Sequence, residues 1–290
     1  MSALAPELVT AVLIEAIPYI RRFRDKVVVV KHGGSALGDS EGGASALELF
    51  AQDVVLMASL GMRPVVVHGG GPQIGALMER LGKQPTFRDG QRVTDAETLE
   101  IARMVLVGKV NRDIVNALNR HGPLAVGLSG EDAGLITASE RDPALGFVGD
   151  VAAVDRTILD RLVAGGLVPV IATIGSSRSG QAYNINADVV AGAVAEALGA
   201  EKVLFLSDVP GVLADVRDPS SRISRLSADA LDELVETGAV AGGMIPKVRA
   251  CTRAVRAGVG SAHVLDGRVP HAALLELFTE EGIGTMVVAG

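Results

Sequence analysis

The chain has 290 residues, of which 48% are hydrophobic, and a formal net charge of −7. This length has room for one large domain or two moderate ones. The acidic balance and the lack of a basic stripe argue against a nucleic-acid partner. The single cysteine, Cys251, excludes an internal disulfide and is typical of a reducing compartment. The five histidines show no metal-ligand spacing. We therefore expect a cytoplasmic protein without a metal held by its own side chains.

The first 24 residues predict an amphipathic helix. Its apolar stripe is Val9, Leu13, Ala16, Ile17 and Ile20. Pro18 should kink this helix or end it near Ile17. The basic cluster follows the apolar run, unlike in a signal peptide, and the run is too short and interrupted to span a membrane. The stripe packs either on its own domain or on the same helix of another subunit, and an arm that precedes a complete fold favours the second.

The first strand–glycine element is VVVVKHGGS, residues 27–35. Four β-branched residues in a row predict a strand that is buried on both faces. The strand delivers Lys31 directly into Gly33 and Gly34, where backbone N–H groups and an ammonium group could bind a phosphate. The alternative is an ordinary strand followed by a glycine turn.

A second element of this kind is PVVVHGGGPQIG, residues 64–75. Gly70 and Gly71 leave no Cβ in the way of a ligand, and a helix that begins near Pro72 would aim its positive end at an anion. Ile74 stands where a dinucleotide-binding fingerprint needs its third glycine, and the chain has no GxxxxGK[ST] loop. One phosphate site shared by the two loops is favoured over two independent turns.

Strands alternate with helices along the whole chain, which predicts an α/β fold around a mainly parallel sheet. Further strands are expected at residues 124–128, 168–172, 202–206, 262–265 and 285–288, and helices at 45–60, 96–120, 156–164, 187–198, 228–236 and 247–257. Ligands of such sheets bind beyond the carboxyl ends of the strands, where both glycine loops fall.

The segment before the helix at 96–120 is polar and rich in turns. Thr94 and Glu97 match a capping box for that helix. The Arg92 guanidinium could bind a carboxylate through two hydrogen bonds, or Arg92 could be a solvated loop residue. The residue pattern alone favours the solvated position.

Three later clusters carry polar groups. The first, YNINAD, contains the side-chain amides of Asn184 and Asn186 and the carboxylate of Asp188, and Asn186 could simply cap a helix. The second, LSDVPG, places Ser207 and Asp208 at the end of a strand. GGMIPK puts Lys247 at the start of a helix, an unfavourable position unless an anion lies nearby.

The order and spacing of eight segments resemble the acetylglutamate kinases of the amino-acid kinase superfamily. The segments are VVVVKHGGS, VVVHGGGPQIG, RVTD, VGLSGEDAGLI, YNINAD, LSDVPG, GGMIPKV and LFTEEGIGTM. The resemblance implies a three-layer α/β/α sandwich with an eight-stranded sheet and an N-terminal amphipathic helix. It also implies a helical arm at residues 1–24, an acetylglutamate-binding lobe at 25–199 and an ATP-binding lobe at 200–290.

The activity implied by the resemblance is transfer of the ATP γ-phosphoryl group to the γ-carboxylate of N-acetyl-L-glutamate, in arginine biosynthesis. Lys31 and Lys247 would flank the phosphoryl group, and Asp188 would hold the two lysines. Mg²⁺ would be carried by the nucleotide phosphates. The other implied positions are Gly33, Gly34, Gly70 and Gly71 for phosphate, Arg92, Asn184, Gly70 and Gly71 for substrate, and Ser207, Asp208, Gly211, Gly243, Met244 and Lys247 for nucleotide.

The helical arm and the segment 271–286 match the arginine-inhibited branch of this family. That match implies feedback inhibition by L-arginine and a homohexamer built as a trimer of dimers. The implied arginine-binding positions are Tyr19, His271, Glu281 and Gly284. Gln91 departs from the family's pattern, in which an apolar residue often precedes the arginine. Two other readings stay open: a sister kinase that acts on a carrier-linked aminoadipate or glutamate, and a catalytically inactive arginine- or nucleotide-binding module.

Overall fold

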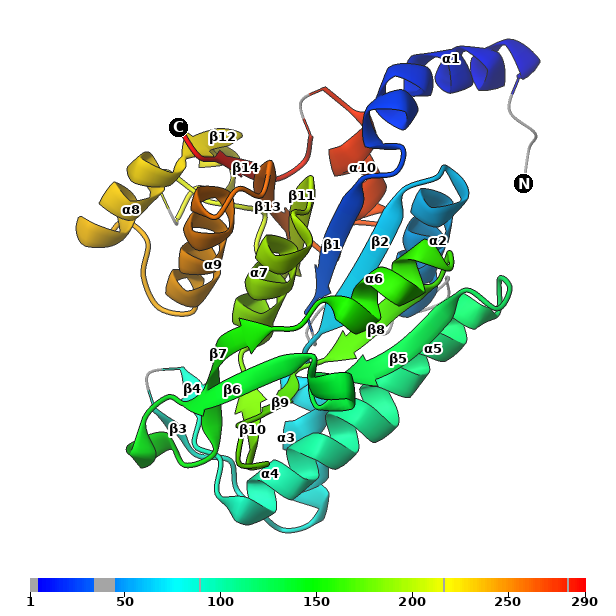
Figure 1. The fold of residues 1–290 in the computed structure, drawn as a ribbon. Coiled ribbons are helices and arrows are strands. Elements are labelled where there is room, and N and C mark those ends of the chain that lie inside the picture. Colours follow the sequence, from blue (N-terminus) through cyan, green and yellow to red (C-terminus); the bar gives the residue numbers. More distant parts are fainter. Residues whose placement is uncertain (1–4, 34–44, 89, 216, 281) are drawn as a thin grey trace.

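The computed structural model describes residues 5–33, 45–88, 90–215, 217–280 and 282–290. Its centre is an eight-stranded sheet between two layers of helices (Figure 1). In spatial order the strands are β12 (Arg225–Ser227), β14 (Thr285–Val288), β13 (Ser261–Asp266), β11 (Lys202–Ser207), β1 (Val27–His32), β2 (Arg63–His68), β8 (Val168–Ala172) and β5 (Ala125–Ser129). Neighbouring strands are parallel except for β13 and β14. The predicted fold class is confirmed.

The run of valines in β1 is buried because the sheet has a hydrophobic core on each face. Val28 and Val30 belong to one core and Val29 to the other, as the alternation of side chains along a strand requires. β1 pairs with β2 on one side and with β11 on the other, so its backbone is also satisfied at both edges.

The first face of the sheet is covered by helices that surround the core containing Val28. They are α2 (Ala46–Ser59), α3 (Gly71–Arg80), α4 (Ala96–Arg103), α5 (Asn111–Asn119) and α10 (Ala272–Phe278). Ser45 caps α2 in a reciprocal capping box with Glu48. Pro72 lies in the first turn of α3, where its missing N–H costs nothing.

The long helical pattern predicted at 96–120 is confirmed, with two differences. Between α4 and α5 the chain adopts a π-helix at Met104–Val110. The capping box of Thr94 and Glu97 is wrong: Asp95 is the N-cap and accepts from the Thr98 N–H. The Thr94 hydroxyl instead donates to the Arg92 carbonyl. Thr94 and Asp95 are both good capping residues, and the local sequence does not distinguish between them.

The second face carries α6 (Thr157–Ala164), α7 (Ala187–Leu198), α8 (Ala228–Glu236) and α9 (Met244–Arg256). α7 lies against β1, β2 and β11 and packs on α9. Asn186 caps α7, because its side-chain oxygen accepts from the N–H groups of Asp188 and Val189. α9 begins three residues earlier than predicted, at Met244.

The strands outside the main sheet were not predicted from the sequence. A second sheet contains β6 (Ile136–Glu140), β7 (Val148–Val154), β9 (Ile174–Ser176) and β10 (Ala182–Ile185). A two-stranded hairpin contains β3 (Phe87–Arg88) and β4 (Gln91–Arg92).

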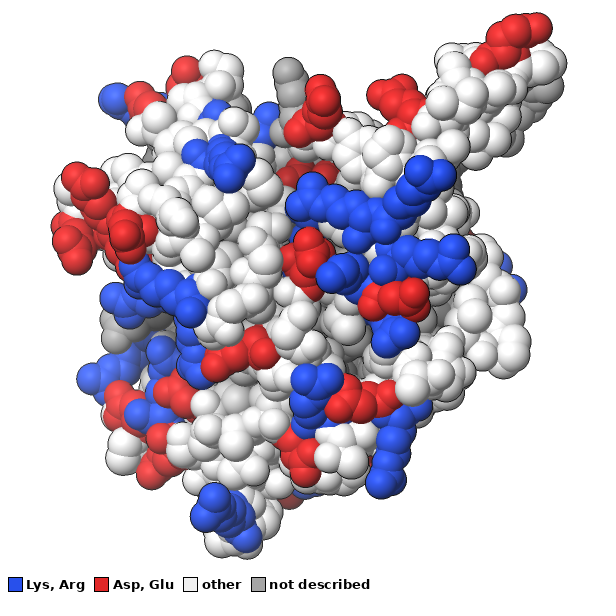
Figure 2. Space-filling view, turned by 45° about the horizontal axis from the view of Figure 1, so that its top comes forward, with Lys and Arg blue, Asp and Glu red and all other residues white. Residues whose placement is uncertain are grey.

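The N-terminal helix α1 (Pro6–Phe23) projects from the body of the molecule and has a mostly uncharged surface (Figures 1 and 2). It continues through Pro18, so the prediction that it could end near Ile17 is wrong. Its last turns are held by tertiary contacts: Phe23 is buried, and the Tyr19 ring meets the Phe278 ring of α10 edge-on at 6.3 Å. Most of its apolar stripe, including Leu13, is exposed. Among the described helices, none is both long and apolar enough to cross a membrane.

Candidate active site

The candidate site lies at the carboxyl ends of β1, β2 and β11, which are neighbours in the sheet. Lys31 is the penultimate residue of β1, Gly69 follows β2, and Ser207 ends β11. Two separate strand–glycine motifs thus reach one edge because β1 and β2 are adjacent and parallel. The sequence predicted this proximity.

A carboxylate between two lysines forms the centre of the site. Asp188 in the first turn of α7 lies 2.9 Å from the Lys31 Nζ and 3.2 Å from the Lys247 Nζ. Lys31 and Lys247 are only 8% and 6% exposed. The three residues come from β1, α7 and α9, and the carboxylate gives each ammonium group a buried partner.

The electrostatics of this cluster favour a bound anion. Burial disfavours the ionised form of Asp188, but the two ammonium groups outweigh it and hold the pKa of that carboxyl below its usual value. Burial lowers the pKa of Lys31 although Asp188 raises it, and Lys247 adds repulsion. Two cations share the Asp188 carboxylate, and Asp208 in the same pocket adds attraction for Lys31. A phosphate placed between the lysines would be paired with two ammonium groups.

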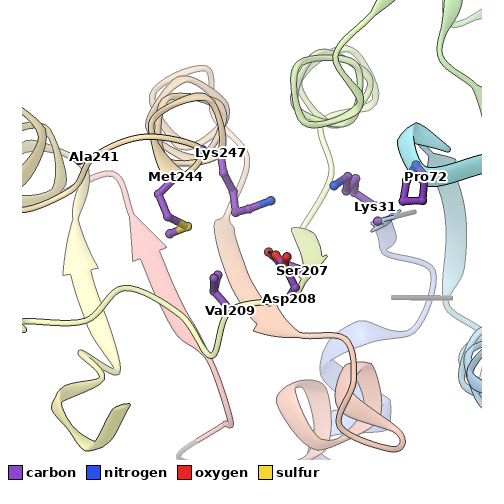
Figure 3. A pocket seen from close by; sticks show the side chains of 10 residues that line it. Lys31, Pro72, Ser207, Asp208, Val209, Ala241, Met244 and Lys247 are labelled. Atoms are coloured by element: carbon purple, nitrogen blue, oxygen red, sulfur yellow. Dashed lines mark hydrogen bonds between the residues drawn. The ribbon is translucent and has the colours of Figure 1, made fainter. Parts of the chain in front are cut away.

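A pocket of about 420 Å³ opens beside these lysines (Figure 3). In the close-up view, Lys31 and Lys247 enter it from opposite sides. Its other lining residues are Gly33, Pro72, Ser207, Asp208, Val209, Ala241, Gly243 and Met244. Of the predicted nucleotide-binding residues, Ser207, Asp208, Gly243, Met244 and Lys247 thus share one pocket.

The donor set of this pocket fits a magnesium–nucleotide. The lysines and the Gly33 backbone suit phosphates, and Val209 with Met244 offers an apolar wall for a base. Asp208 supplies a carboxylate oxygen, the kind of ligand that Mg²⁺ accepts. Across the described ranges, no group of three or more His, Cys, Asp or Glu side chains is gathered as a metal cage.

Gly211 was predicted to bind nucleotide, but it is not among the residues that line this pocket. Its φ is 142°, and a Cβ there would lie 2.5 Å from the Thr285 Oγ1. Glycine is therefore required at this position by its backbone conformation and by the approach of β14.

The glycine loop after β2 is fixed by two residues that the sequence analysis missed. The buried His68 donates from Nδ1 to the Gly69 carbonyl at 3.0 Å and accepts at Nε2 from the Asn111 amide at 3.1 Å. Burial lowers the pKa of His68 to about 4. A histidine at the end of an apolar strand is the local signal that could have identified it.

The glycines of this loop differ in their surroundings. A Cβ on Gly70 would lie 2.7 Å from the Leu106 Cδ2 in the π-helical segment, whereas a Cβ on Gly71 would meet nothing within 4 Å. A side chain on Gly70 would therefore have to displace the Leu106 methyl group, whereas Gly71 leaves open space at the start of α3. Gly34, the fourth predicted phosphate-binding glycine, lies outside the described residues.

Arg92 lies over the glycine loop. Its Nη2 donates to the Gly71 carbonyl at 2.9 Å. The solvated position that the residue pattern alone favoured is therefore wrong. Asn184 is on β10, in register with Val148 of β7 and Ile174 of β9. Its chain neighbour Asn186 caps α7, which carries Asp188.

The residues predicted to bind L-arginine do not line one common pocket in the structure. Tyr19 lines a pocket of about 440 Å³ together with Lys202, His263 and Glu276. His271 lines a different, smaller pocket, and its Nδ1 lies 2.6 Å from Asp53 of α2.

Gly284 is a close-packed position, where a Cβ would overlap the Val264 carbonyl oxygen, and its N–H donates to Glu276. Glu281 lies outside the described residues. The sequence analysis missed a row of three buried polar side chains behind the Tyr19 pocket. The middle one, His263, contacts Lys202 at 2.8 Å through Nε2 and Glu276 at 2.5 Å through Nδ1.

Comparison with known proteins places this geometry in a family. The model of the amino acid kinase family matches residues 26–266. An acetylglutamate kinase of Symbiobacterium thermophilum is 54% identical over 96% of this chain and 97% of its own length. One of Moorella thermoacetica is 51% identical over 99% of both chains.

Solved structures agree with the fold. An N-acetylglutamate synthase from Neisseria gonorrhoeae, in complex with coenzyme A and N-acetyl-glutamate, is 27% identical with a TM-score of 0.83. The match covers 96% of this chain, which spans only 63% of the synthase chain. A carbamate kinase from Giardia lamblia bound to AMP-PNP shares the fold, with a TM-score of 0.70 at 17% identity over 92% of this chain and 99% of its own. The chain belongs to the amino acid kinase family, and within it to the acetylglutamate kinases.

Proposed function

We propose that this protein transfers the γ-phosphoryl group of ATP to the γ-carboxylate of N-acetyl-L-glutamate. The observation that carries the proposal is the buried cluster of Lys31, Asp188 and Lys247 at the edge of the nucleotide-sized pocket. The full-length similarity to acetylglutamate kinases names the acceptor.

The reaction needs no general base, because the acceptor carboxylate is already ionised at neutral pH. One of its oxygens forms a bond to the γ-phosphorus, the bond from that phosphorus to the β–γ bridging oxygen breaks, and ADP leaves with the electron pair. The protein must bring two anions together in line and neutralise the transferring group. Lys31 and Lys247 act on that group from opposite sides, and Asp188 fixes both ammonium positions.

The two halves of the sheet divide the substrates. The half from residues 200–290 supplies Ser207, Asp208 and Lys247 to the nucleotide pocket. The half from 25–199 supplies Gly71, Arg92 and Asn184 for acetylglutamate, with the Arg92 guanidinium as the fork for its α-carboxylate. Mg²⁺ bound to the nucleotide phosphates would supply further charge neutralisation, and the Asp208 carboxylate that lines this pocket would be a ligand for it.

ADP release with Mg-ATP tests the function when N-acetyl-L-glutamate is compared with glutamate, aspartate and carbamate. We expect turnover confined to acetylglutamate. Turnover with another acceptor alone would reject the proposal. A folded protein that binds ATP and turns over none of the four would favour a carrier-linked acceptor or an inactive binding module.

We further propose that L-arginine inhibits the enzyme by binding the Tyr19 pocket. The exposed carboxylate of Glu280 lines this pocket and suits a guanidinium group, and Tyr19 joins α1 to α10. The Neisseria gonorrhoeae synthase, which shares the fold, is described in complex with L-arginine. The exposed apolar stripe of α1 pairs with a second copy, so that a hexamer forms as a trimer of dimers.

Arginine titration of the wild type and of Tyr19→Ala tests this regulation. We expect the concentration for half-inhibition to rise at least tenfold in the variant while its uninhibited rate is retained. His271→Ala tests the other predicted arginine-binding position, which lines a different pocket: unchanged sensitivity would assign the arginine site to the Tyr19 pocket alone. A Tyr19→Ala enzyme with full sensitivity would contradict the proposed arginine site.

A further inference from the structure

Phe87 is an aromatic side chain in an unusual position. It lies on the β3–β4 hairpin and is 57% exposed. The face of this ring is therefore available to a neighbouring group. The ring lies beneath a charged group: the Arg92 guanidinium carbon is 4.9 Å from its centroid. Phe87 and Arg92 are also cross-strand partners in the hairpin.

Two further contacts hold the guanidinium at its edge. Nη2 donates to the Gly71 carbonyl at 2.9 Å, and Nη1 lies 3.2 Å from the Met78 sulfur. These two contacts engage two of the five N–H donors that an arginine carries. Together with the ring face they fix both the position and the plane of the fork.

The hairpin itself does not depend on Phe87 for its closure. Lys83, before the hairpin, lies 2.8 Å from Asp95 and 2.7 Å from Glu97, both at the start of α4. The Val93 N–H donates to the Thr86 carbonyl across the hairpin base. Replacing the exposed ring therefore leaves the backbone of the hairpin in place.

We propose that Phe87 is a positioning residue for substrate binding, and that its ring holds the Arg92 guanidinium in the plane that receives the acetylglutamate α-carboxylate. This inference rests on the proposed function, in which Arg92 binds that carboxylate. A bidentate contact needs a fixed fork, and a guanidinium that rotates freely must be ordered again each time substrate binds. The ring thus contributes to affinity without touching the substrate.

The test compares Phe87→Leu with Phe87→Trp, which keeps an aromatic face. An exposed cation–π contact is worth up to about 1 kcal/mol, so we expect the KM for acetylglutamate to rise roughly fivefold in Phe87→Leu. The kcat and the KM for ATP should stay within twofold of wild type. Phe87→Trp should keep the wild-type KM. Leu81→Ala, at another exposed apolar position beside the hairpin, is the matched control and should change neither constant.

A double-mutant cycle separates positioning from simple packing. On an Arg92→Lys background, Phe87→Leu should cause no further rise in KM, because the planar fork is already gone. An unchanged KM in Phe87→Leu, an equal loss in Phe87→Trp, or a full additional effect on the Arg92→Lys background would each overturn the positioning role. Calorimetric titration of wild type with acetylglutamate separates the two hypotheses. Wild-type binding with an unaffected Phe87→Leu rejects only the role of Phe87, whereas absence of wild-type binding rejects the proposed function as well.

Discussion

The Asp188 carboxylate has two buried ammonium partners, and this ratio decides what the site can bind. Each lysine is anchored on a different element, Lys31 on β1 and Lys247 on α9. A buried cation is costly unless it is paired. Asp188 is shared by the two lysines, and Asp208 adds attraction for Lys31, so an anion placed between the lysines would gain two ammonium partners. A transferring phosphoryl group is such an anion.

Replacing Lys247 with alanine should lower kcat by about 10²-fold or more, the scale seen when one preorganised charge-stabilising group is removed. Steady-state kinetics with acetylglutamate would measure the loss. Lys202→Ala removes a lysine in the Tyr19 pocket and is the control, with kcat expected within a few-fold of wild type. A near-normal kcat in Lys247→Ala would refute the assigned role.

The residues predicted from the sequence are those with a local signature. Lys31 and the glycines of both loops follow apolar strands, and Asn186 precedes a helix, so position along the chain indicates what each can do. The residues that were missed have long-range partners. His68 is fixed by Asn111, 43 positions away, and His263 by Lys202, 61 positions away. No spacing rule relates such pairs until the fold brings them together.

At the scale of elements, the strands of the main sheet and most of its helices were predicted well, and the strands of the second sheet and of the hairpin were not. β1 is buried on both faces and reads as a continuous apolar run, and α7 is a twelve-residue helix with a named cap, so both have a clear signature in the sequence. β3 and β4 have two residues each and β9 has three, too few to show any period. The hairpin that carries Arg92 therefore emerged only from the structure.

The α1 helix has an exposed apolar stripe that should pair with a second copy. Leu13 is 61% exposed. Leu13→Glu should break the association through α1 while the melting temperature of the subunit stays close to wild type, because this side chain has little to lose in the monomer. Sedimentation equilibrium would measure the mass.

Ala11→Glu is the matched control for Leu13→Glu. Ala11 is four positions from Glu7 and from Glu15, so it lies on the polar side of the helix. The same added charge there should leave the mass unchanged. If both variants or neither changed the mass, assembly through the stripe would be contradicted.

At the scale of the whole molecule, two buried histidines tie global stability to pH. Burial lowers the pKa of His32 to about 3 and that of His68 to about 4, against 6.5 in the unfolded chain. The unfolded state therefore binds more protons below pH 6.5, and stability is lost as the pH falls through that value toward the folded pKa values. Each histidine should lower the free energy of unfolding by about 2 kcal/mol between pH 7 and pH 5.

Urea denaturation at several pH values would measure this dependence. His68→Gln removes one titrating group, so its stability should fall less steeply between pH 7 and pH 5 than that of wild type. His121→Gln, at an exposed position, should keep the wild-type slope. Equal slopes in wild type and His68→Gln would show that His68 is not held neutral.

The most direct test of the central claim detects the bond that forms. A phosphorylated carboxylate reacts with hydroxylamine to give a hydroxamate, which ferric ion reveals by colour. With Mg-ATP and N-acetyl-L-glutamate we expect hydroxamate to form in step with ADP, and both to depend on Lys31 and Lys247. ADP release without hydroxamate would mean that water, not the carboxylate, receives the phosphoryl group, and would contradict the account.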